Sequence, residues 1–325
     1  MSELRWGFIG NGWIAKVVAG DMKLAGLNIQ AVGARSQAKA DEFADLYGIP
    51  NRHPSYEALV NDPEVDIVYV ATPHPFHVRD AIQALNAGKH VLCEKPFAIN
   101  TKEACEIAEA AKRNNVFLME AMWTRFLPVQ AAIQDVIKSG QIGKIKIVVA
   151  DHTRYLVDIR RLWEPELGGG ALLDLGVYPL NFIVRLLGLP SKITSTAKLS
   201  DEKVDEYLMC QLEFENGGMA SFVTTSSVAG ENTATIYCEN GRIEVAGLAW
   251  EKTSFSVFNA AGDLISKYDK THEGTGRQFQ VMEAERCVKA NLLESPTMPV
   301  SETISIMKLM DQIRAQVGVK YPMEK

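Results

Sequence analysis

The first third of the chain alternates short apolar runs with stretches of helical periodicity. Apolar runs of strand length lie at residues 4–9, 29–34, 66–71, 90–93 and 116–119. Between them, apolar side chains recur at the three- and four-residue spacing of an amphipathic helix at residues 38–47, 78–87 and 103–112. Strands that alternate with helices predict βαβ units and a parallel sheet, and the nearly continuous apolar runs predict cover on both faces of that sheet.

The rest of the chain has a different pattern. After a long helical stretch at residues 170–187, short alternating runs lie at residues 192–198, 206–214, 219–225, 233–237, 242–245 and 253–258. Two Asn-Gly turns, at residues 215–218 and 239–241, are hairpin signals, and helical periodicity returns at residues 277–291 and 301–316. We therefore predict an α/β chain: an N-terminal Rossmann domain with a doubly wound parallel sheet (residues 1–121), then an α+β domain with a large open, mostly antiparallel sheet (residues 122–325).

Composition narrows the class of protein. The chain is 47% hydrophobic and 23% charged, as in folded globular proteins, and its net charge of −6 lacks the basic excess of a nucleic-acid or membrane surface. No apolar run approaches the ~20 residues of a membrane helix, and the N-terminal residues lack the pattern of a signal peptide. The five cysteines are far apart, with no CxxC pair, which indicates reduced thiols. We expect a cytoplasmic protein with no nucleic-acid or membrane partner.

A glycine-rich turn follows the first predicted strand. Residues 10–15 read Gly-Asn-Gly-Trp-Ile-Ala and fit the G-x-G-x-x-A pattern of dinucleotide-binding turns. Gly10 permits the tight turn, and Gly12 lets the backbone approach a pyrophosphate that the following helix N-terminus binds. An ordinary glycine turn is the alternative. The predicted cofactor-binding residues of this turn are Gly10, Asn11, Gly12, Trp13 and Ile14.

The end of the second predicted strand distinguishes NADP from NAD. An NAD site carries Asp or Glu here, but no acidic residue occurs between Asp21 and Asp41. Arg35, followed by Ser36, lies where a 2′-phosphate would bind, and a guanidinium matches phosphate geometry. We predict NADP(H) as the preferred cofactor, with NAD(H) possible. The alternative is a solvated Arg35 beside a Ser36 that only caps the next helix.

Polar residues follow two more strands of the predicted parallel sheet. Because the carboxyl ends of parallel strands meet at one edge, these residues are expected at the cofactor crevice. His74 and His77 have no third ligand nearby, so we predict no metal site. For Glu94 and Lys95 a surface ion pair is the alternative. The further predicted cofactor-binding residues are Thr72, Pro73, His74, His77, Glu94 and Lys95.

The long predicted helix of the second domain follows three glycines at residues 168–170, which would allow close approach to a ligand. It carries Asp174 and Tyr178 at i and i+4, on one face. Pro179 predicts a kink or loosening of this helix. Each feature alone favours a structural role, but together with a nucleotide-binding domain they indicate a hydride-transfer site.

These motifs resemble the Gfo/Idh/MocA oxidoreductases over essentially the whole chain. The longest matching stretches are residues 117–126 (FLMEAMWTRF) and 169–178 (GGALLDLGVY). The resemblance is closest to the branch that contains dimeric dihydrodiol dehydrogenase and NADP-dependent D-xylose dehydrogenase. Many members of the family carry His at the position of Tyr178, whereas this branch carries Tyr.

The resemblance implies an NAD(P)-dependent dehydrogenase or reductase acting on CH–OH groups. It implies Lys95 and Tyr178 as the catalytic pair with Asp174 nearby, Trp123 and Arg125 around the substrate, and a homodimer built on the open sheet. A lysine ammonium within ~4–6 Å would favour the phenolate of a tyrosine, whose ordinary pKa is ~10. We expect hydride transfer between nicotinamide and a secondary alcohol or carbonyl of a sugar, polyol or trans-dihydrodiol.

Other functions stay open at this point. Within the family, the chain could be an inositol dehydrogenase or an anhydro- or keto-sugar reductase. A non-catalytic NADP-sensing regulator is the alternative from another class, although such a protein needs no Lys95–Tyr178 pair. Arg154, Arg160 and Arg161 could bind an acidic substrate, but a solvated face is the favoured interpretation.

Overall fold

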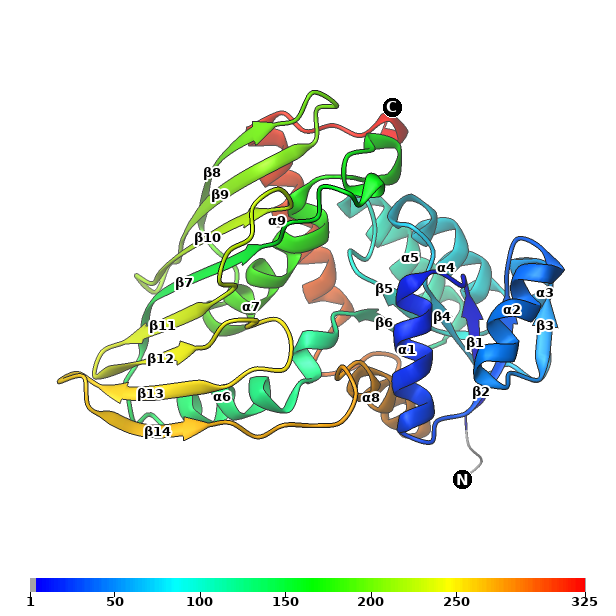
Figure 1. Ribbon diagram of the computed structural model, residues 1–325, viewed down its shortest axis with the longest axis horizontal. Helices are drawn as coiled ribbons and strands as arrows, with labels where there is room; N and C mark the ends of the chain where they lie inside the picture. Colours follow the sequence, from blue (N-terminus) through cyan, green and yellow to red (C-terminus); the bar gives the residue numbers. More distant parts are fainter. Residues whose placement is uncertain (1–3, 325) are drawn as a thin grey trace. The chain divides into compact units, whose positions relative to one another are not determined.

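The computed structural model describes residues 4–324, and the chain forms two compact units (Figure 1). The first contains the chain up to Phe126 together with Glu273–Met307, and the second contains Leu127–His272 and the chain from Lys308 onward. The sequence-based division assigned residues 273–307 to the second domain. They belong to the first unit because α8 (Gln278–Lys289) packs there, where the buried indole of Trp6 donates to Glu285 at 3.1 Å.

The first unit contains a parallel sheet of six strands in the order β3-β2-β1-β4-β5-β6, the order of dinucleotide-binding folds. The five predicted strands are present, whereas the sixth strand, Asn-Arg-His in sequence, is too polar to have been recognised. The strands are β1 (Trp6–Ile9), β2 (Ile29–Gly33), β3 (Asn51–His53), β4 (Ile67–Val70), β5 (His90–Glu94) and β6 (Leu118–Ala121).

Helices cover this sheet, and the strands other than β3 are buried along nearly their whole length. Besides α8, the helices of this unit are α1 (Trp13–Leu24), α2 (Gln37–Tyr47), α3 (Tyr56–Val60), α4 (His77–Asn86) and α5 (Thr101–Asn114), with 3-10 turns η1 (His74–Phe76) and η2 (Trp123–Phe126).

The second unit is built on an eight-stranded sheet in the order β14-β13-β12-β11-β7-β10-β9-β8. Neighbouring strands are antiparallel except β7 and β10, which are parallel. The fold therefore confirms the predicted open, mostly antiparallel sheet. The strands are β7 (Ile145–Thr153), β8 (Lys192–Leu199), β9 (Asp205–Glu213), β10 (Met219–Thr225), β11 (Ala234–Cys238), β12 (Gly241–Val245), β13 (Phe255–Asn259) and β14 (Leu264–Tyr268).

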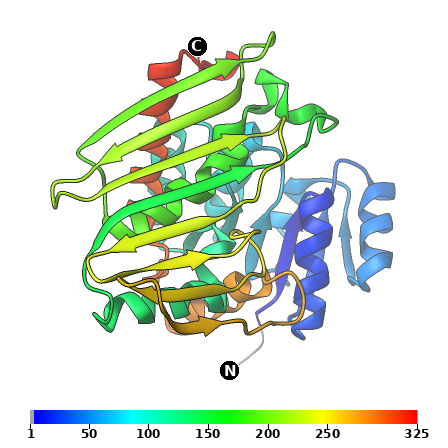
Figure 2. The ribbon, with the colours of Figure 1, turned by 60° about the vertical axis from the view of Figure 1, so that its left-hand side comes forward.

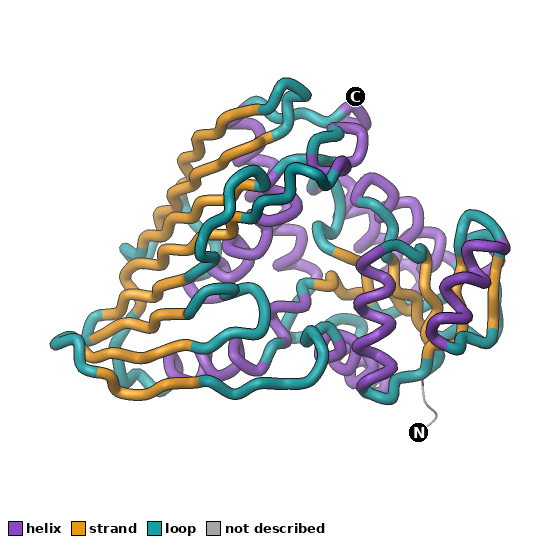
Figure 3. The backbone as a smooth tube through the Cα atoms, in the orientation of Figure 1, coloured by secondary structure: helices purple, strands orange, loops and turns teal. Residues whose placement is uncertain are grey.

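Helices lie along one face of this sheet, and Figure 2 shows the other face with no helix in front of it. The tube in Figure 3 shows the strands as one continuous layer. Alternate residues of β8 are exposed and half-buried, as expected for a strand with one open face. The helices are α6 (Pro128–Lys138), the π-helical turn η5 (Leu172–Gly176), α7 (Val177–Leu187) and α9 (Val300–Val317), which crosses the boundary between the units, with short turns η3 (Arg160–Leu162), η4 (Pro165–Leu167) and η6 (Pro322–Glu324).

The stretch Pro165–Leu187 corrects the expectation that no part of the chain approaches the length and apolar character of a membrane helix. By length and composition it is apolar enough to cross a membrane, with a mean hydropathy of 1.4 over its most apolar window. However, 83% of that window is buried inside the protein, and the buried Asp174 lies within the stretch. Its apolar character is that of a helix in the core of the second unit.

Candidate functional site

The glycine turn after β1 has the geometry of an anion-binding site. Gly10 has φ +98°, and a Cβ there would lie 2.9 Å from the carbonyl oxygen of Ala71, so only glycine fits. A Cβ on Gly12 would meet nothing within 4 Å, which leaves room for a ligand to approach. The first turn of α1 holds no acidic residue, and no side chain caps it. Its N–H groups and positive dipole end are therefore suited to a pyrophosphate.

The other predicted residues of this turn have different environments. Trp13, the first residue of α1, is 73% exposed, and Ile14 is half-buried. The side-chain amide of Asn11 donates to the carbonyl of Lys39 at 3.2 Å, which links the turn to the start of α2. Trp13 thus offers an exposed indole directly beside the proposed pyrophosphate position.

Arg35 and Ser36 are exposed directly after β2. Ser36 has the N-cap position of α2, but its side chain makes no capping hydrogen bond. Burial raises the pKa of Tyr56, and Arg35 and Arg79 act against that rise, so both cations lie close to this phenol. Sequence analysis did not identify Tyr56 and Arg79 as site residues. They follow different strands in the chain, so only the fold brings them close to the end of β2.

The residues after β4 have two different roles: the Thr72 hydroxyl is available to a ligand, whereas the His77 ring connects two turns of the protein. The hydroxyl of Thr72 is buried and has no hydrogen-bond partner within residues 4–324. The fully buried ring of His77 lies 2.8 Å from the Thr72 carbonyl and 2.9 Å from the Pro96 carbonyl. It ties the turn after β4 to the turn after β5. His74 lies edge-on to this ring, with the ring centroids 5.9 Å apart.

Glu94 is a buried acceptor, not part of a surface ion pair. It accepts a hydrogen bond from the hydroxyl of Tyr69 and one of 3.2 Å from the backbone N–H of Lys95. Burial raises the pKa of Glu94, and the bond from Tyr69 and the nearby cations Lys95 and Arg277 oppose the rise. The Glu94 carboxyl therefore orders the backbone that presents Lys95.

Trp123 and Arg125 are both almost fully buried. The guanidinium of Arg277 lies over the Trp123 ring, 3.9 Å from its centroid, which covers one face of the indole. Arg125 pairs with Glu302 and donates to the carbonyl of Thr297 at 3.0 Å. Arg277, which sequence analysis did not identify, is thus a further cation in the first unit near Glu94 and Trp123.

In the second unit, two of the three glycines, Gly169 and Gly170, pack against the protein's own atoms. A Cβ on Gly170 would lie 2.1 Å from Oδ1 of Asp205, and a Cβ on Gly169 would lie 2.7 Å from the Leu162 carbonyl oxygen. The close approach that the glycines permit is therefore to the chain itself. Asp205 is buried, and its Oδ2 accepts a 2.6 Å bond from the N–H of Leu172, the first residue of η5. Asp205 had no sequence signal.

Asp174 lies in the π-helical turn η5, and Tyr178 in the first turn of α7. The helix is thus irregular, as predicted, and π turns are common at functional sites. Asp174 is buried and accepts a 3.0 Å bond from Arg161. The ring of Tyr178 lies edge-on to that of His152, with centroids 5.0 Å apart and the planes at 74°.

The arginines of the segment between β7 and η5 have carboxylate partners. Arg154 pairs with Glu251, Arg160 with Glu164, and Arg161 with Asp174.

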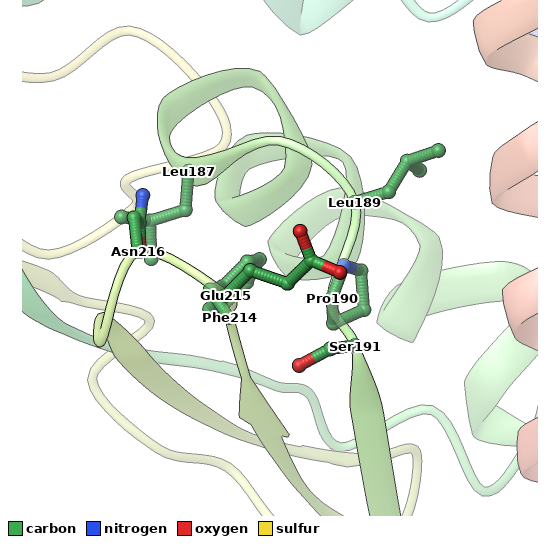
Figure 4. A pocket seen from close by; sticks show the side chains of 7 residues that line it. All are labelled: Leu187, Leu189, Pro190, Ser191, Phe214, Glu215 and Asn216. Atoms are coloured by element: carbon green, nitrogen blue, oxygen red, sulfur yellow. The ribbon is translucent and has the colours of Figure 1, made fainter.

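A surface hollow of this unit lies at the other end of α7 from Tyr178, at the turn before β8 and the β9–β10 hairpin (Figure 4). It contains none of the predicted site residues. Its lining consists of Leu187, Leu189, Pro190, Ser191, Phe214, Glu215 and Asn216.

Comparison with known proteins identifies the family. Residues 4–122 match the profile described as "Oxidoreductase family, NAD-binding Rossmann fold", and residues 130–244 match the "GFO/IDH/MocA C-terminal domain". The chain belongs to the Gfo/Idh/MocA oxidoreductase family. It is therefore an oxidoreductase whose first unit has the NAD-binding Rossmann fold of that family.

Relatives within the family match over nearly the whole chain. The chain is 38% identical to trans-1,2-dihydrobenzene-1,2-diol dehydrogenase of Danio rerio (98% of each chain covered) and 30% identical to that of Homo sapiens (99% of each). An aldose-aldose oxidoreductase from Caulobacter crescentus, solved with glycerol, has the same fold (TM-score 0.89, 23% identity, 98% of each chain). So does a 3-ketoreductase from Actinomadura kijaniata, solved with NADP (TM-score 0.87, 22% identity, 97% of this chain and 98% of that one).

Proposed function

We propose that the protein is an NADP(H)-dependent oxidoreductase that transfers hydride between nicotinamide and a secondary alcohol or carbonyl of a sugar, polyol or trans-dihydrodiol. The observation that carries this proposal is full-length similarity to trans-dihydrodiol dehydrogenases in a chain that keeps the dinucleotide-binding turn, Lys95 and Tyr178. The substrate class comes from these relatives.

Several features of the first unit support the proposed binding of the cofactor there. The open space at Gly12 and the uncapped N-terminus of α1 suit the pyrophosphate, and Trp13 and Ile14 begin the helix beside it. Thr72 and the His74 turn, braced by His77, contribute the next edge of this site. Arg35, exposed after β2 and near Tyr56 and Arg79, supports a 2′-phosphate and hence NADP(H) over NAD(H).

The proton transfer is assigned to Lys95 and Tyr178. When bound, the nicotinamide supplies or accepts the hydride at its C4 atom. In the oxidation direction, Tyr178 is proposed to take the proton of the substrate hydroxyl. The resemblance to the family implies Lys95 as the cation that favours the phenolate. In reduction, Tyr178 donates its proton to the new alkoxide while Lys95 stabilises the negative charge. Asp174 holds Arg161 and orders the turn that precedes Tyr178.

Trp123 and Arg125 are proposed to shape the substrate side. Because Arg125 is engaged with Glu302 and Thr297, its role there is to fix the turn that presents Trp123. Arg277, stacked on Trp123, has a buried Nε atom without a hydrogen-bond partner among the described residues. We assign to Arg277 the binding of a substrate oxygen.

The assembly is proposed to be a homodimer, in the cytoplasm, that forms through the open face of the eight-stranded sheet. Large apolar side chains of adjacent strands lie exposed on that face. A second copy of the chain would bury them from water. They are Ile147, Val149, Met209, Met219 and Tyr237.

Replacing the proton-transfer residues tests the activity. Tyr178→Phe and Lys95→Met should each lower kcat by ~10²–10⁴-fold, the typical contribution of general acid–base catalysis, while leaving NADP(H) binding largely intact. Nicotinamide absorbance with a panel of sugars, polyols and dihydrodiols measures turnover, and tryptophan fluorescence measures binding. Tyr268→Phe and Lys102→Met make the same chemical changes away from the site, as controls.

Turnover at the wild-type rate in both variants would overturn the Lys95–Tyr178 assignment. If the wild-type protein binds NADP(H) but turns over no compound of the panel, a cofactor-sensing regulator becomes the better interpretation. Preference within the panel for an inositol or for an anhydro- or keto-sugar would identify a different specificity within the same family.

A further inference from the structure

His152 lies beside the proposed proton-transfer residue of the second unit. It is on the helix-covered face of β7 and 6% exposed. Its ring contacts that of Tyr178 edge-on at 5.0 Å and that of Trp250 at 5.9 Å. The indole N–H of Trp250 donates in turn to the carbonyl of Asp151 at 2.8 Å. The imidazole therefore sits in a packed aromatic cluster, and it also makes a polar contact.

That polar contact is to the helix that carries Tyr178. Nδ1 of His152 lies 3.0 Å from the carbonyl oxygen of Leu175. In an α-helix the carbonyl of residue 175 would accept from the N–H of residue 179, but residue 179 is proline and has none. A backbone N–H at the start of α7 donates to the Leu175 carbonyl, and Pro179 leaves the second lone pair of this oxygen to an outside donor, which His152 is placed to supply.

The contact also fixes the form of the imidazole. A carbonyl oxygen only accepts, so Nδ1 carries the proton, and in the neutral ring Nε2 is an acceptor. The charged groups on the elements around it are Asp174 of η5, which pairs with Arg161, and Asp151 of β7, which binds the N–H groups of Asn232 and Thr233. The adjacent strand β10 contributes the Thr224 hydroxyl, which donates to the carbonyl of His152 at 3.0 Å.

We propose that His152 is a positioning residue for Tyr178: it holds the phenol ring in place through the Leu175 carbonyl, to which Pro179 cannot donate. This inference rests on the proposed proton-transfer role of Tyr178. It gives Pro179 a function as well, since an ordinary helical residue at that position would supply the N–H that His152 now replaces. The polar imidazole also gives the phenolate a better-solvated neighbour than a hydrocarbon ring would.

Replacing the imidazole by a ring of similar shape separates packing from polarity. His152→Phe should lower kcat about 10-fold near pH 7 and move the rise of kcat with pH about one unit upward, with the KM for NADP(H) changed less than twofold. The Tyr178 ring can be followed without turnover, as the near-ultraviolet circular dichroism difference between each protein and its Tyr178→Phe partner. This difference should decrease in His152→Phe.

A double-mutant cycle tests the route through the carbonyl. Pro179→Ala gives the helix an N–H that competes for the Leu175 carbonyl, so it should shift the kcat profile in the same direction as His152→Phe. In the double variant the shift should equal that of His152→Phe alone, because no imidazole is left to displace. Phe182→Leu alters the same cluster through Trp250, which it contacts, and should leave the profile in place.

The possible outcomes separate this inference from the proposed function. Unchanged circular dichroism and kcat in His152→Phe, or additive shifts in the cycle, would overturn the role of His152 even if Tyr178→Phe is inactive. Full turnover in Tyr178→Phe would instead overturn the proposed function, while the circular dichroism difference still reports on the contact between His152 and Tyr178. If His152→Phe proves unfolded by its melting curve, His152→Gln and Pro179→Ala carry the same test.

Discussion

Arg35 is the side chain that we propose to decide between NADP(H) and NAD(H). Its charge lies beside the end of β2, where a 2′-phosphate would accept charge-assisted hydrogen bonds worth ~1.5–3 kcal/mol. Arg35→Ala should therefore weaken NADP(H) binding by ~10–100-fold and NAD(H) binding by less than about threefold. Tryptophan fluorescence titration with both cofactors measures this, and Arg113→Ala in the last turn of α5 is the control. Equal affinity of the wild-type protein for the two cofactors would contradict the assignment.

At the scale of residues, the sequence predicted the positions of candidate site residues along the chain better than it predicted their burial and hydrogen-bond partners. The glycine turn and the polar residues after β4 and β5 lie where the strand pattern predicted them. Their environments differ, since His77 and Glu94 are buried and bonded internally. A strand pattern shows where a strand ends, but the direction of the next side chain depends on partners such as Tyr69, which lies on another strand.

At the scale of elements, the segment from the three glycines to α7 is held by distant parts of the second unit. Asp205, at the start of β9, binds Leu172 across 33 residues, and the Tyr321 hydroxyl donates to the Gly169 carbonyl across 152 residues. Sequence spacing reveals Asp174 and Tyr178 because they share one helix. It could not reveal Asp205, His152 or Tyr321, because only the folded sheet and the C-terminal segment bring them to this helix.

The buried carboxyl of Asp205, which anchors the N–H of Leu172, lowers the free energy of unfolding by an amount that depends on pH. Burial raises its pKa from 3.8 to about 7, so the folded protein holds this proton more tightly than the unfolded chain does. Stability should therefore fall as pH rises from about 4 to about 7, by up to ~1.4 kcal/mol for each unit of pKa difference. Asp205→Asn removes this ionisation, so its urea midpoint should change less between pH 5 and pH 8 than that of the wild type. An identical change with pH in both proteins would contradict the prediction.

Glu120 is a matched control for that measurement in the first unit. It is also buried, it accepts a bond of 3.1 Å from the Thr303 hydroxyl, and burial raises its pKa to about 7. Glu120→Gln should flatten the pH dependence of stability with the same sign, without the loss of kcat that a displaced η5 would cause in Asp205→Asn. The comparison separates the general cost of a buried carboxyl from the specific function of the Asp205 anchor.

At the scale of the whole molecule, the two architectures were predictable because each has a periodic signature. Alternating strands and helices indicate a parallel sheet, and consecutive short strands with Asn-Gly turns indicate an antiparallel one. The parallel pairing of β7 with β10 and the placement of Glu273–Met307 in the first unit were not predictable. Both depend on contacts between segments far apart in the chain, which leave no local pattern.

The open face of the second sheet leads to the last prediction, on assembly. Val149 lies in the middle of β7 on that face, between Ser221 of β10 and Thr235 of β11, and is 44% exposed. Val149 is already exposed within one chain, so Val149→Glu should preserve the fold of the chain. The variant should nevertheless place a charge in the proposed interface, where an unpaired charge is costly.

Light scattering should therefore give about twice 35.9 kDa for the wild type and 35.9 kDa for Val149→Glu at micromolar concentration. Leu46→Glu makes the same kind of change on α2, where Leu46 is 60% exposed, and should remain dimeric. A monomeric wild type would leave the apolar face without its proposed partner. A dimeric Val149→Glu would assign the interface to another surface.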